Sequence, residues 1–266
     1  MHFHFLDSYR PRESLVHSLD PRIKLVFTLV FIVTTALVPA GAWPVYILLI
    51  AVIVSIEVIS SLGIGFVQKR SLAAIPFMLA ALPIIFTAPG VELTSFSMGS
   101  WTITISQPGL ERFISIGLKS WISIQAAIVL TASTPFPDLL VAMRAIRIPP
   151  IIVAVVGLMW RYLFVLVDEA IRLNQARASR SGHPRETQGK VAGGIVWRAR
   201  VTGGMVGTLF LRAFERSDRI YMAMLSRGYD GEMRSLPFPP LRSLDWVILI
   251  SGLGLCAILL SISLLL

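Results

Sequence analysis

The stretch IIVAVVGLMWRYLFVLV, residues 151–167, decides the fold of this 266-residue chain. Its length and apolar content suit a membrane-spanning helix, which needs roughly 17–25 mainly apolar residues. However, Arg161 interrupts the run, and Asp168 and Glu169 follow it directly. Whether this stretch crosses a membrane determines on which side all later residues lie, so the remainder of the chain must decide its role.

The composition of the chain is that of a membrane protein. It is 55% hydrophobic and 15% charged, whereas an ordinary soluble domain has about 25% charged residues. Residues 138–245 carry 16 Lys and Arg and 9 Asp and Glu, which is +7 of the total net charge of +9. The high apolar and low charged content excludes a disordered chain and argues against a soluble enzyme. The basic excess favours a cytoplasmic membrane face over a nucleic-acid site.

Five apolar runs predict membrane spans: Ile23–Val38, Trp43–Ile59, Leu72–Pro89, Phe113–Ala132 and Trp246–Leu266. Pro76 and Pro83 predict kinks in the third span. In the loop that follows it, the alternating stretch 100–105 predicts a short strand or hairpin. Basic residues before the first span and in the loop 60–71 place both segments on the cytoplasmic side.

The same rule decides the role of residues 151–167. If they crossed the membrane, the basic region after them would lie outside, against the positive-inside pattern. We therefore expect an apolar helix that lies on the membrane surface or against other helices. The N-terminus is then cytoplasmic and the C-terminus outside.

The predicted fold class is an all-α integral membrane protein with about five transmembrane helices and a cytoplasmic domain of long amphipathic helices. The predicted boundaries are 1–132 for the membrane domain, 133–245 for the cytoplasmic domain and 246–266 for the final span.

Three helices are expected in the cytoplasmic domain. The first begins with Thr134 as N-cap and Pro135 at the first helical position. The second runs over 150–181 and the third over 191–227, where Gly228 is the expected C-cap. Glycines in the front half of the third helix predict close helix packing.

The two long helices end in similar tips, Ser179-Arg180-Ser181 and Ser226-Arg227-Gly228. An arginine at a helix C-terminus can simply complement the helix dipole. Alternatively, small neighbours leave each guanidinium free to enter a groove on a partner, where its rigid fork binds carboxylates in a bidentate manner.

These tips belong to a pattern that resembles the transmembrane T component of energy-coupling factor (ECF) transporters, in its cobalt-type branch, CbiQ. The opening SLVHSLDPRIK, residues 14–24, is similar to the family's N-terminal signature. The segment TPFPDLL, residues 134–140, leading to Arg147-Ile148-Pro149, is similar to the start of its coupling domain. Residues 159–162, with Asp168 and Glu169, complete the pattern.

The resemblance implies a non-catalytic subunit of an ATP-driven importer. In this family, tips of Ala-Arg-Gly type dock on two ABC-type, CbiO-like ATPase subunits. The membrane helices hold a separate substrate-binding membrane protein, CbiM-like and in some systems joined by a CbiN-like protein. The implied substrate is cobalt, with nickel or a vitamin as the alternative within the family. Membrane lipid is a partner and nucleic acid is not.

Site residues follow from the resemblance. Serine stands at 179 and 226 where the family has alanine, and Ser181 stands where it has glycine. Ala176-Arg177-Ala178 offers a second register for the first tip. The expected supporting residues are Arg161, Asp168, Glu169 and Arg177. No cofactor or metal is expected on this chain, and ATP is expected on the partner subunits, because the sequence has no G-x-x-x-x-G-K-[ST] motif. The implied location is the cytoplasmic, or inner, membrane.

Other charged residues and histidines receive ordinary interpretations. Glu57 and Lys119 are expected to extend toward the membrane surface from their helices. His17 and His183 are expected to be solvated, and His2 and His4 to be incidental rather than a metal site. Asp168 and Glu169 are expected to pair with Arg161 or Arg172 along one helix.

Two other classes of function remain as alternatives. A stand-alone secondary transporter or channel would need polar groups that converge at the membrane midplane, or broken helices in repeated halves. An intramembrane enzyme would need clustered His and Glu, or Ser and Lys, at membrane depth. The predicted spans supply neither arrangement.

Overall fold

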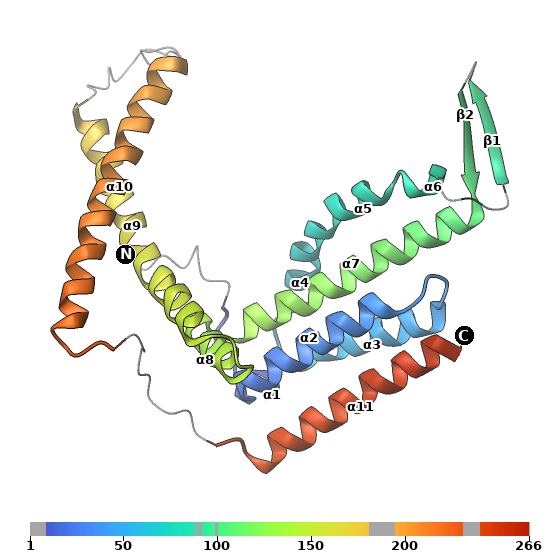
Figure 1. Cartoon of the computed structure of the whole chain (residues 1–266). Coiled ribbons are helices and arrows are strands. Elements are labelled where there is room, and N and C mark those ends of the chain that lie inside the picture. The colour runs from blue at the N-terminus through green and yellow to red at the C-terminus, as the bar shows by residue number, and fades with distance from the viewer. Residues whose placement is uncertain are drawn as a thin grey trace. The chain divides into compact units, whose positions relative to one another are not determined.

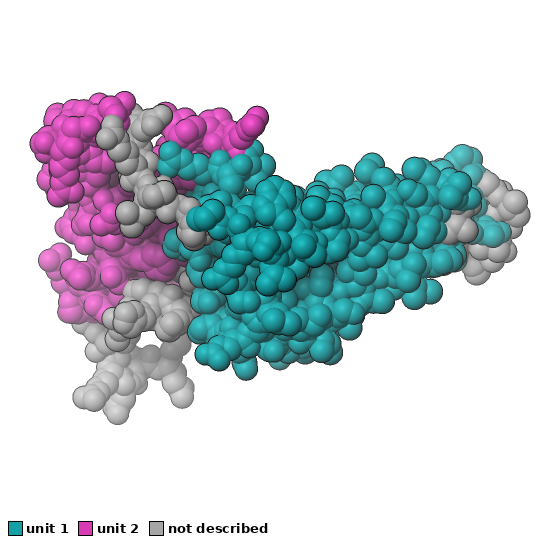
Figure 2. Space-filling view, turned by 90° about the horizontal axis from the view of Figure 1, so that it is seen from below, with its two compact units in different colours: residues 1–146, 237–266 teal, residues 147–236 magenta. Residues whose placement is uncertain are grey.

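The computed structural model describes residues 9–87, 89, 92–98, 101–180, 195–230 and 240–265, and Figure 1 shows their helices and strands. The chain divides into two compact units, shown in different colours in Figure 2. The first unit combines residues 1–146 with residues 237–266, and the second comprises residues 147–236. The second unit is therefore an insertion in the chain of the first.

The first unit is a bundle of helices with one small sheet. Its elements are α1 (Leu15–Ser18), α2 (Pro21–Leu37), α3 (Trp43–Ile59), α4 (Ile64–Ser71), the 3₁₀ helix η1 (Leu72–Ala74), α5 (Ile75–Ala81), α6 (Ile84–Thr87), β1 (Glu92–Met98), β2 (Trp101–Ser106), α7 (Gln107–Ser133), α8 (Phe136–Ala145) and α11 (Ser243–Leu265). Figure 1 shows α2, α3, α7 and α11 side by side.

Local signals explain where the long helices of this unit begin. The Asp20 carboxylate accepts a hydrogen bond from the backbone N–H of Arg22, and Pro21 occupies the first position of α2. Ser106 caps α7 in the same way, through the N–H of Gly109 at 3.2 Å. Both are preferred arrangements at a helix N-terminus, because they satisfy an N–H group that the helix leaves unbonded.

The core of the bundle lies where α2, α3, α7 and α11 meet. Side chains from all four helices form one apolar cluster, which includes Phe31, Tyr46, Leu49, Ile122 and Cys256. The Tyr46 hydroxyl donates to the carbonyl oxygen of Pro39 at 3.0 Å, so the polar atom of this buried side chain has a hydrogen-bond partner.

Both prolines predicted to kink the third span interrupt its helix. The 3₁₀ turn η1 precedes α5, which has Pro76 in its first turn. Leu82 and Pro83 form a turn that separates α5 from α6. The predicted hairpin is also present: β1 and β2 pair antiparallel, with Met98 opposite Trp101 and Glu92 opposite Ser106. Residues 99 and 100 lie outside the described part of the chain.

The two charged residues within the predicted spans have different surroundings. Lys119 of α7 donates to the carbonyl oxygen of Ala36 at 3.0 Å, in the last turn of α2, whose final carbonyls lack helical partners. Glu57 of α3 is fully buried, and neither carboxyl oxygen has a hydrogen-bond partner among the described residues. The expectation that Glu57 extends toward the membrane surface is therefore wrong.

The second unit consists of two helices of 31 residues each, α9 (Pro150–Arg180) and α10 (Ile195–Leu225). These match the predicted second and third cytoplasmic helices, except that residues 181–194 are not described. The predicted start of the first cytoplasmic helix is wrong. Thr134 is the C-cap of α7, and Pro135 takes the N-cap position of α8.

The all-α membrane class is confirmed, with the β1–β2 hairpin as its one addition among the described residues. Four helical segments there are long and apolar enough to cross a membrane: 64–87, 107–133, 150–180 and 243–265; α3 is a shorter apolar helix. The segment 150–180 is α9, so length and composition alone allow it to cross. The charge argument against that crossing remains a prediction.

Candidate functional site

The C-terminal ends of α9 and α10 share a local structure. In each, the serine hydroxyl donates to the backbone carbonyl three residues earlier: Ser179 to Ala176 and Ser226 to Ala223, both at 3.0 Å. The hydroxyl groups are thereby satisfied within their own helices. Each serine thus acts as a small residue beside its arginine and does not compete for the arginine's partner.

Arg180 and Arg227 are both exposed. Neither guanidinium makes a hydrogen bond or an ion pair with another described residue. Within the described part of the chain, the five N–H donors of each guanidinium are therefore not taken up by another residue. Arg177, the arginine of the alternative register, is half-buried on α9. Ser181 lies outside the described residues.

The end of α10 is closed without help from Arg227. Gly228 has a φ of +79°, the left-handed conformation that glycine adopts without strain. The N–H of Tyr229 donates to Met224 O at 3.1 Å, and that of Gly228 to Leu225 O at 3.0 Å. This pair of bonds is a Schellman motif, which satisfies the last carbonyls of a helix. The Arg227 side chain is not needed as a cap.

The supporting residues are arranged differently from the expectation. Glu169 forms an ion pair with Arg212 of α10, 43 positions away in sequence, rather than with Arg161 or Arg172. Arg161 instead has its guanidinium carbon 5.9 Å from the centre of the Tyr162 ring. Asp168 is exposed on α9. Arg212, which sequence reasoning missed, thus links the two helices that carry the arginine tips.

The second unit leaves much of its apolar surface uncovered. On α10, Phe210 and Phe214 are 67% and 61% exposed. Gly203, Gly204 and Gly207 belong to the predicted packing face. A Cβ atom added at any of them would have no described atom within 4 Å, apart from the neighbouring backbone of its own helix. The expected close helix contact is therefore absent among the described residues. Exposed apolar patches of this kind mark surfaces for a protein or membrane partner.

A second cluster joins Arg10 and the N-terminal signature, residues 14–24, to the end of α7. The N–H of Arg10 donates to Ala132 O at 3.0 Å, and its guanidinium lies 3.7 Å from the centre of the Phe66 ring. Lys24 donates to the carbonyl oxygens of His17 at 3.1 Å and Ser133 at 3.3 Å. The signature thus binds the C-terminal end of α7, next to the start of α8.

His17 is bonded inside this cluster rather than solvated, so that expectation is wrong. Its Nε2 lies 3.1 Å from Arg10 O, which can only accept. Its Nδ1 lies 2.7 Å from the Ser14 hydroxyl, and in a neutral ring this atom accepts from that hydroxyl. Burial lowers the pKa of His17, and Lys24 and Arg12 lower it further, against the effect of the Arg10 carbonyl. Both ring nitrogens are thus bonded, and burial favours the neutral ring over the charged one.

No group of three or more His, Cys, Asp or Glu side chains suited to a metal ion occurs within the described residues. His2, His4 and His183 lie outside them. The cluster and the tips therefore offer hydrogen bonds and charge, and among the described residues neither presents a metal-ligand set.

Comparison with known proteins gives a family match over most of the chain. The family model CbiQ, described as cobalt transport protein, matches residues 12–237. This range includes the N-terminal signature, the α7–α8 junction and both arginine tips.

Three relatives illustrate the similarity. The cobalt transport protein CbiQ of Rhodobacter capsulatus is 27% identical over 73% of this chain and 74% of its own length. The energy-coupling factor transporter transmembrane protein EcfT of Macrococcus caseolyticus is 27% identical over 91% of this chain and 89% of its own. A putative fused cobalt transport protein CbiMQ of Methanocorpusculum labreanum is 26% identical over 79% of this chain and 34% of its own.

Proposed function

Because the chain belongs to the CbiQ family of cobalt transport proteins, we propose that it is the energy-coupling transmembrane subunit of an ECF-type ABC importer. In this role the chain performs no catalysis. It connects ATPase subunits, which bind and hydrolyse ATP, to a separate membrane protein that binds the substrate. The observation that carries the proposal is the pair of exposed arginine tips, Arg180 and Arg227, at the ends of two equally long helices.

Each tip would dock in a groove on one of two CbiO-like ATPase subunits. The register through Ser179, Arg180 and Ser181 is supported by the exposure of Arg180, whereas Arg177 is half-buried. The tip formed by Ser226, Arg227 and Gly228 is supported by the Schellman motif, which leaves the guanidinium free of a capping role. A bidentate pair with a carboxylate in each groove would anchor both helices.

Motion would pass from the ATPases to the membrane through α9 and α10. When the ATPases close or open, the separation of their grooves changes, and the anchored tips move with them. The ion pair between Glu169 and Arg212 lies between the two helices and resists their separation. Supporting roles for Arg161, Asp168 and Arg177 are part of the same proposal.

The substrate-binding partner would be a CbiM-like membrane protein, with a CbiN-like protein as a further partner. The relative whose name joins CbiM and CbiQ in one chain supports such a pairing. We propose cobalt as the substrate on the strength of the family match. Nickel or a vitamin is the second candidate, supported by the relative named EcfT, whose name specifies no metal. The proposed location is the cytoplasmic membrane, with a cytoplasmic N-terminus, the domain 133–245 on the same side, and the C-terminus outside.

The test is reversal of charge at the tips. Arg180→Glu together with Arg227→Glu should release the ATPases on purification in mild detergent and stop uptake of radioactive cobalt by cells. Loss of one partner of a desolvated charge pair costs about 2–5 kcal/mol, so binding should weaken at least about 30-fold for each tip.

Arg200→Glu is the matched control, because Arg200 is exposed on α10 near its other end. It should leave both the complex and uptake unchanged. Full assembly and uptake with both tips reversed would refute the docking role. Uptake of substrate by the purified chain alone in liposomes would instead favour a stand-alone transporter.

A further inference from the structure

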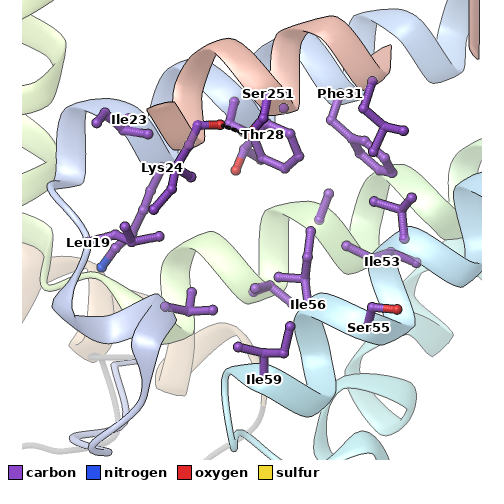
Figure 3. Close-up of a pocket in the computed structure, with 18 of the residues that line it drawn as sticks. Leu19, Ile23, Lys24, Thr28, Phe31, Ile53, Ser55, Ile56, Ile59 and Ser251 are labelled. Carbon is purple, nitrogen blue, oxygen red and sulfur yellow. Dashed lines mark hydrogen bonds between the residues drawn. The ribbon is translucent and has the colours of Figure 1, made fainter. Parts of the chain in front are cut away.

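The first unit contains a cavity that the proposed function does not use. It has a volume of about 930 Å³ and lies between α11, α2, α3 and the end of α7 (Figure 3). This volume is at the upper end of the roughly 300–1,000 Å³ of small-molecule sites. Leu48 of α3 and Ile258 of α11 line it and remain 45% and 59% exposed. The cavity is therefore open on the side where these two helices face outward.

The charged residues that line the cavity are confined to one end of it. They are Lys24 in the first turn of α2, and Arg242 and Asp245 at the start of α11. The rest of the lining is aliphatic or aromatic, apart from a glycine and a few hydroxyl groups such as those of Thr28, Ser55 and Ser251. Figure 3 shows Lys24 at one side of the space and Phe31 and Ile53 at the other.

The charged end offers donors to an anion. Lys24 donates to two carbonyl oxygens, of His17 and Ser133. An ammonium group has three donors, so the third is not taken up by any residue that the structure describes. The Arg242 side chain is exposed at the cavity. Asp245 is buried and accepts from the backbone N–H of Arg242 at 3.1 Å, which holds its carboxylate against the helix start. The formal charge of the three charged lining residues, Lys24, Arg242 and Asp245, is +1.

We infer that the cavity binds a phospholipid with an anionic headgroup. One acyl chain occupies the apolar space, and the phosphate lies at Lys24 and Arg242. The cavity has charged side chains at one end and apolar side chains elsewhere. It therefore matches an amphiphile, which has a charged headgroup and an apolar chain. A partner's transmembrane helix has two polar ends and would not match the far end of the cavity, which is lined by Phe31, Ile258 and Ile262.

The experiment measures lipids retained by the full chain, with whatever partners purify with it. The protein is reconstituted in nanodiscs of equal phosphatidylglycerol and phosphatidylcholine, extracted in mild detergent and examined by native mass spectrometry. Wild type should retain phosphatidylglycerol in preference to phosphatidylcholine. Arg242→Gln should reduce that preference about five-fold, the factor for one cation near an anionic surface. Lys69→Gln, at an exposed lysine outside the cavity, should not.

A second pair of variants tests the acyl-chain site. Ser55→Trp fills the cavity and should reduce retention of both lipids, whereas Val58→Trp, on the exposed side of α3 outside the cavity, should not. If the Ser55→Trp variant does not fold, Ala51→Phe replaces it as the variant that fills the cavity.

A crosslinking experiment identifies the occupant directly. A photoreactive benzophenone residue at position 55 should form adducts with lipid. Equal retention in the Ser55 and Val58 variants, or adducts with a protein only, would overturn the inference. None of these readouts depends on uptake or on the ATPases.

Discussion

Two lysines lie within or next to the apolar helices, and backbone carbonyl groups bind the charge of each. Lys119 bonds to Ala36 O in the last turn of α2, and Lys24 bonds to Ser133 O in the last turn of α7. The final carbonyls of a helix have no helical partner, and a cation there is favoured by the helix dipole. Both lysines therefore have a structural role that requires no ion pathway.

His17 gives a prediction about pH at the same scale. Its folded-state pKa is lowered below the ordinary value, so between that lowered pKa and about 6.5 the unfolded state binds more protons than the folded state. The contribution of His17 to stability is complete above about pH 6.5 and is lost as the pH falls through the folded pKa. The melting temperature in mild detergent should therefore decrease between about pH 7.5 and about pH 5.5.

His17→Gln is the variant that checks this, because glutamine can donate and accept but does not titrate. Its melting temperature should change less than that of wild type over the same range. Parallel curves for the two proteins would show that another group is responsible.

At the scale of elements, α6 and α7 approach closely at Gly109. A side-chain carbon there would lie 2.8 Å from Ile85 O, a backbone atom that cannot move aside cheaply. Alanine normally favours a helix over glycine by about 1 kcal/mol, but here the clash should outweigh that gain. We expect Gly109→Ala to lower the free energy of unfolding by about 1–3 kcal/mol.

Denaturation in mild detergent, followed by tryptophan fluorescence, measures this effect. Gly254→Ala in α11 is the matched control, because nothing lies within 4 Å of the added carbon, and it should be neutral or slightly stabilising. Equal behaviour of the two variants would mean that α6 is free to shift away from α7.

The elements also show which features the sequence allows one to predict. Periodicity and prolines located α9, α10, the breaks at Pro76 and Pro83, and the hairpin, because these depend on neighbours within a few residues. The pair Glu169–Arg212 and the bond from Lys119 to Ala36 join residues 43 and 83 positions apart. No local pattern specifies such partners. For the same reason the burial of Glu57 without a described partner could not be foreseen.

At the scale of the whole molecule, the side of the membrane reached by α9 is open to direct measurement. If α9 does not cross, the five predicted spans place the C-terminus outside. A fusion of alkaline phosphatase after Leu266 should then be active, and a green fluorescent protein inserted after residue 190 should fluoresce. Phosphatase activity at residue 190 would show that α9 crosses and would contradict the charge-based topology.

The insertion of the second unit into the first also has a consequence for synthesis. The 109 residues between the end of α7 and the start of α11 take the ribosome about 5–20 s at roughly 5–20 residues per second. During that interval, α2, α3 and α7 are already made while the wall of the cavity that α11 supplies does not yet exist. A lipid from the surrounding bilayer can settle against Phe27 and Thr28 before α11 arrives, so the last helix closes over a site that is already filled.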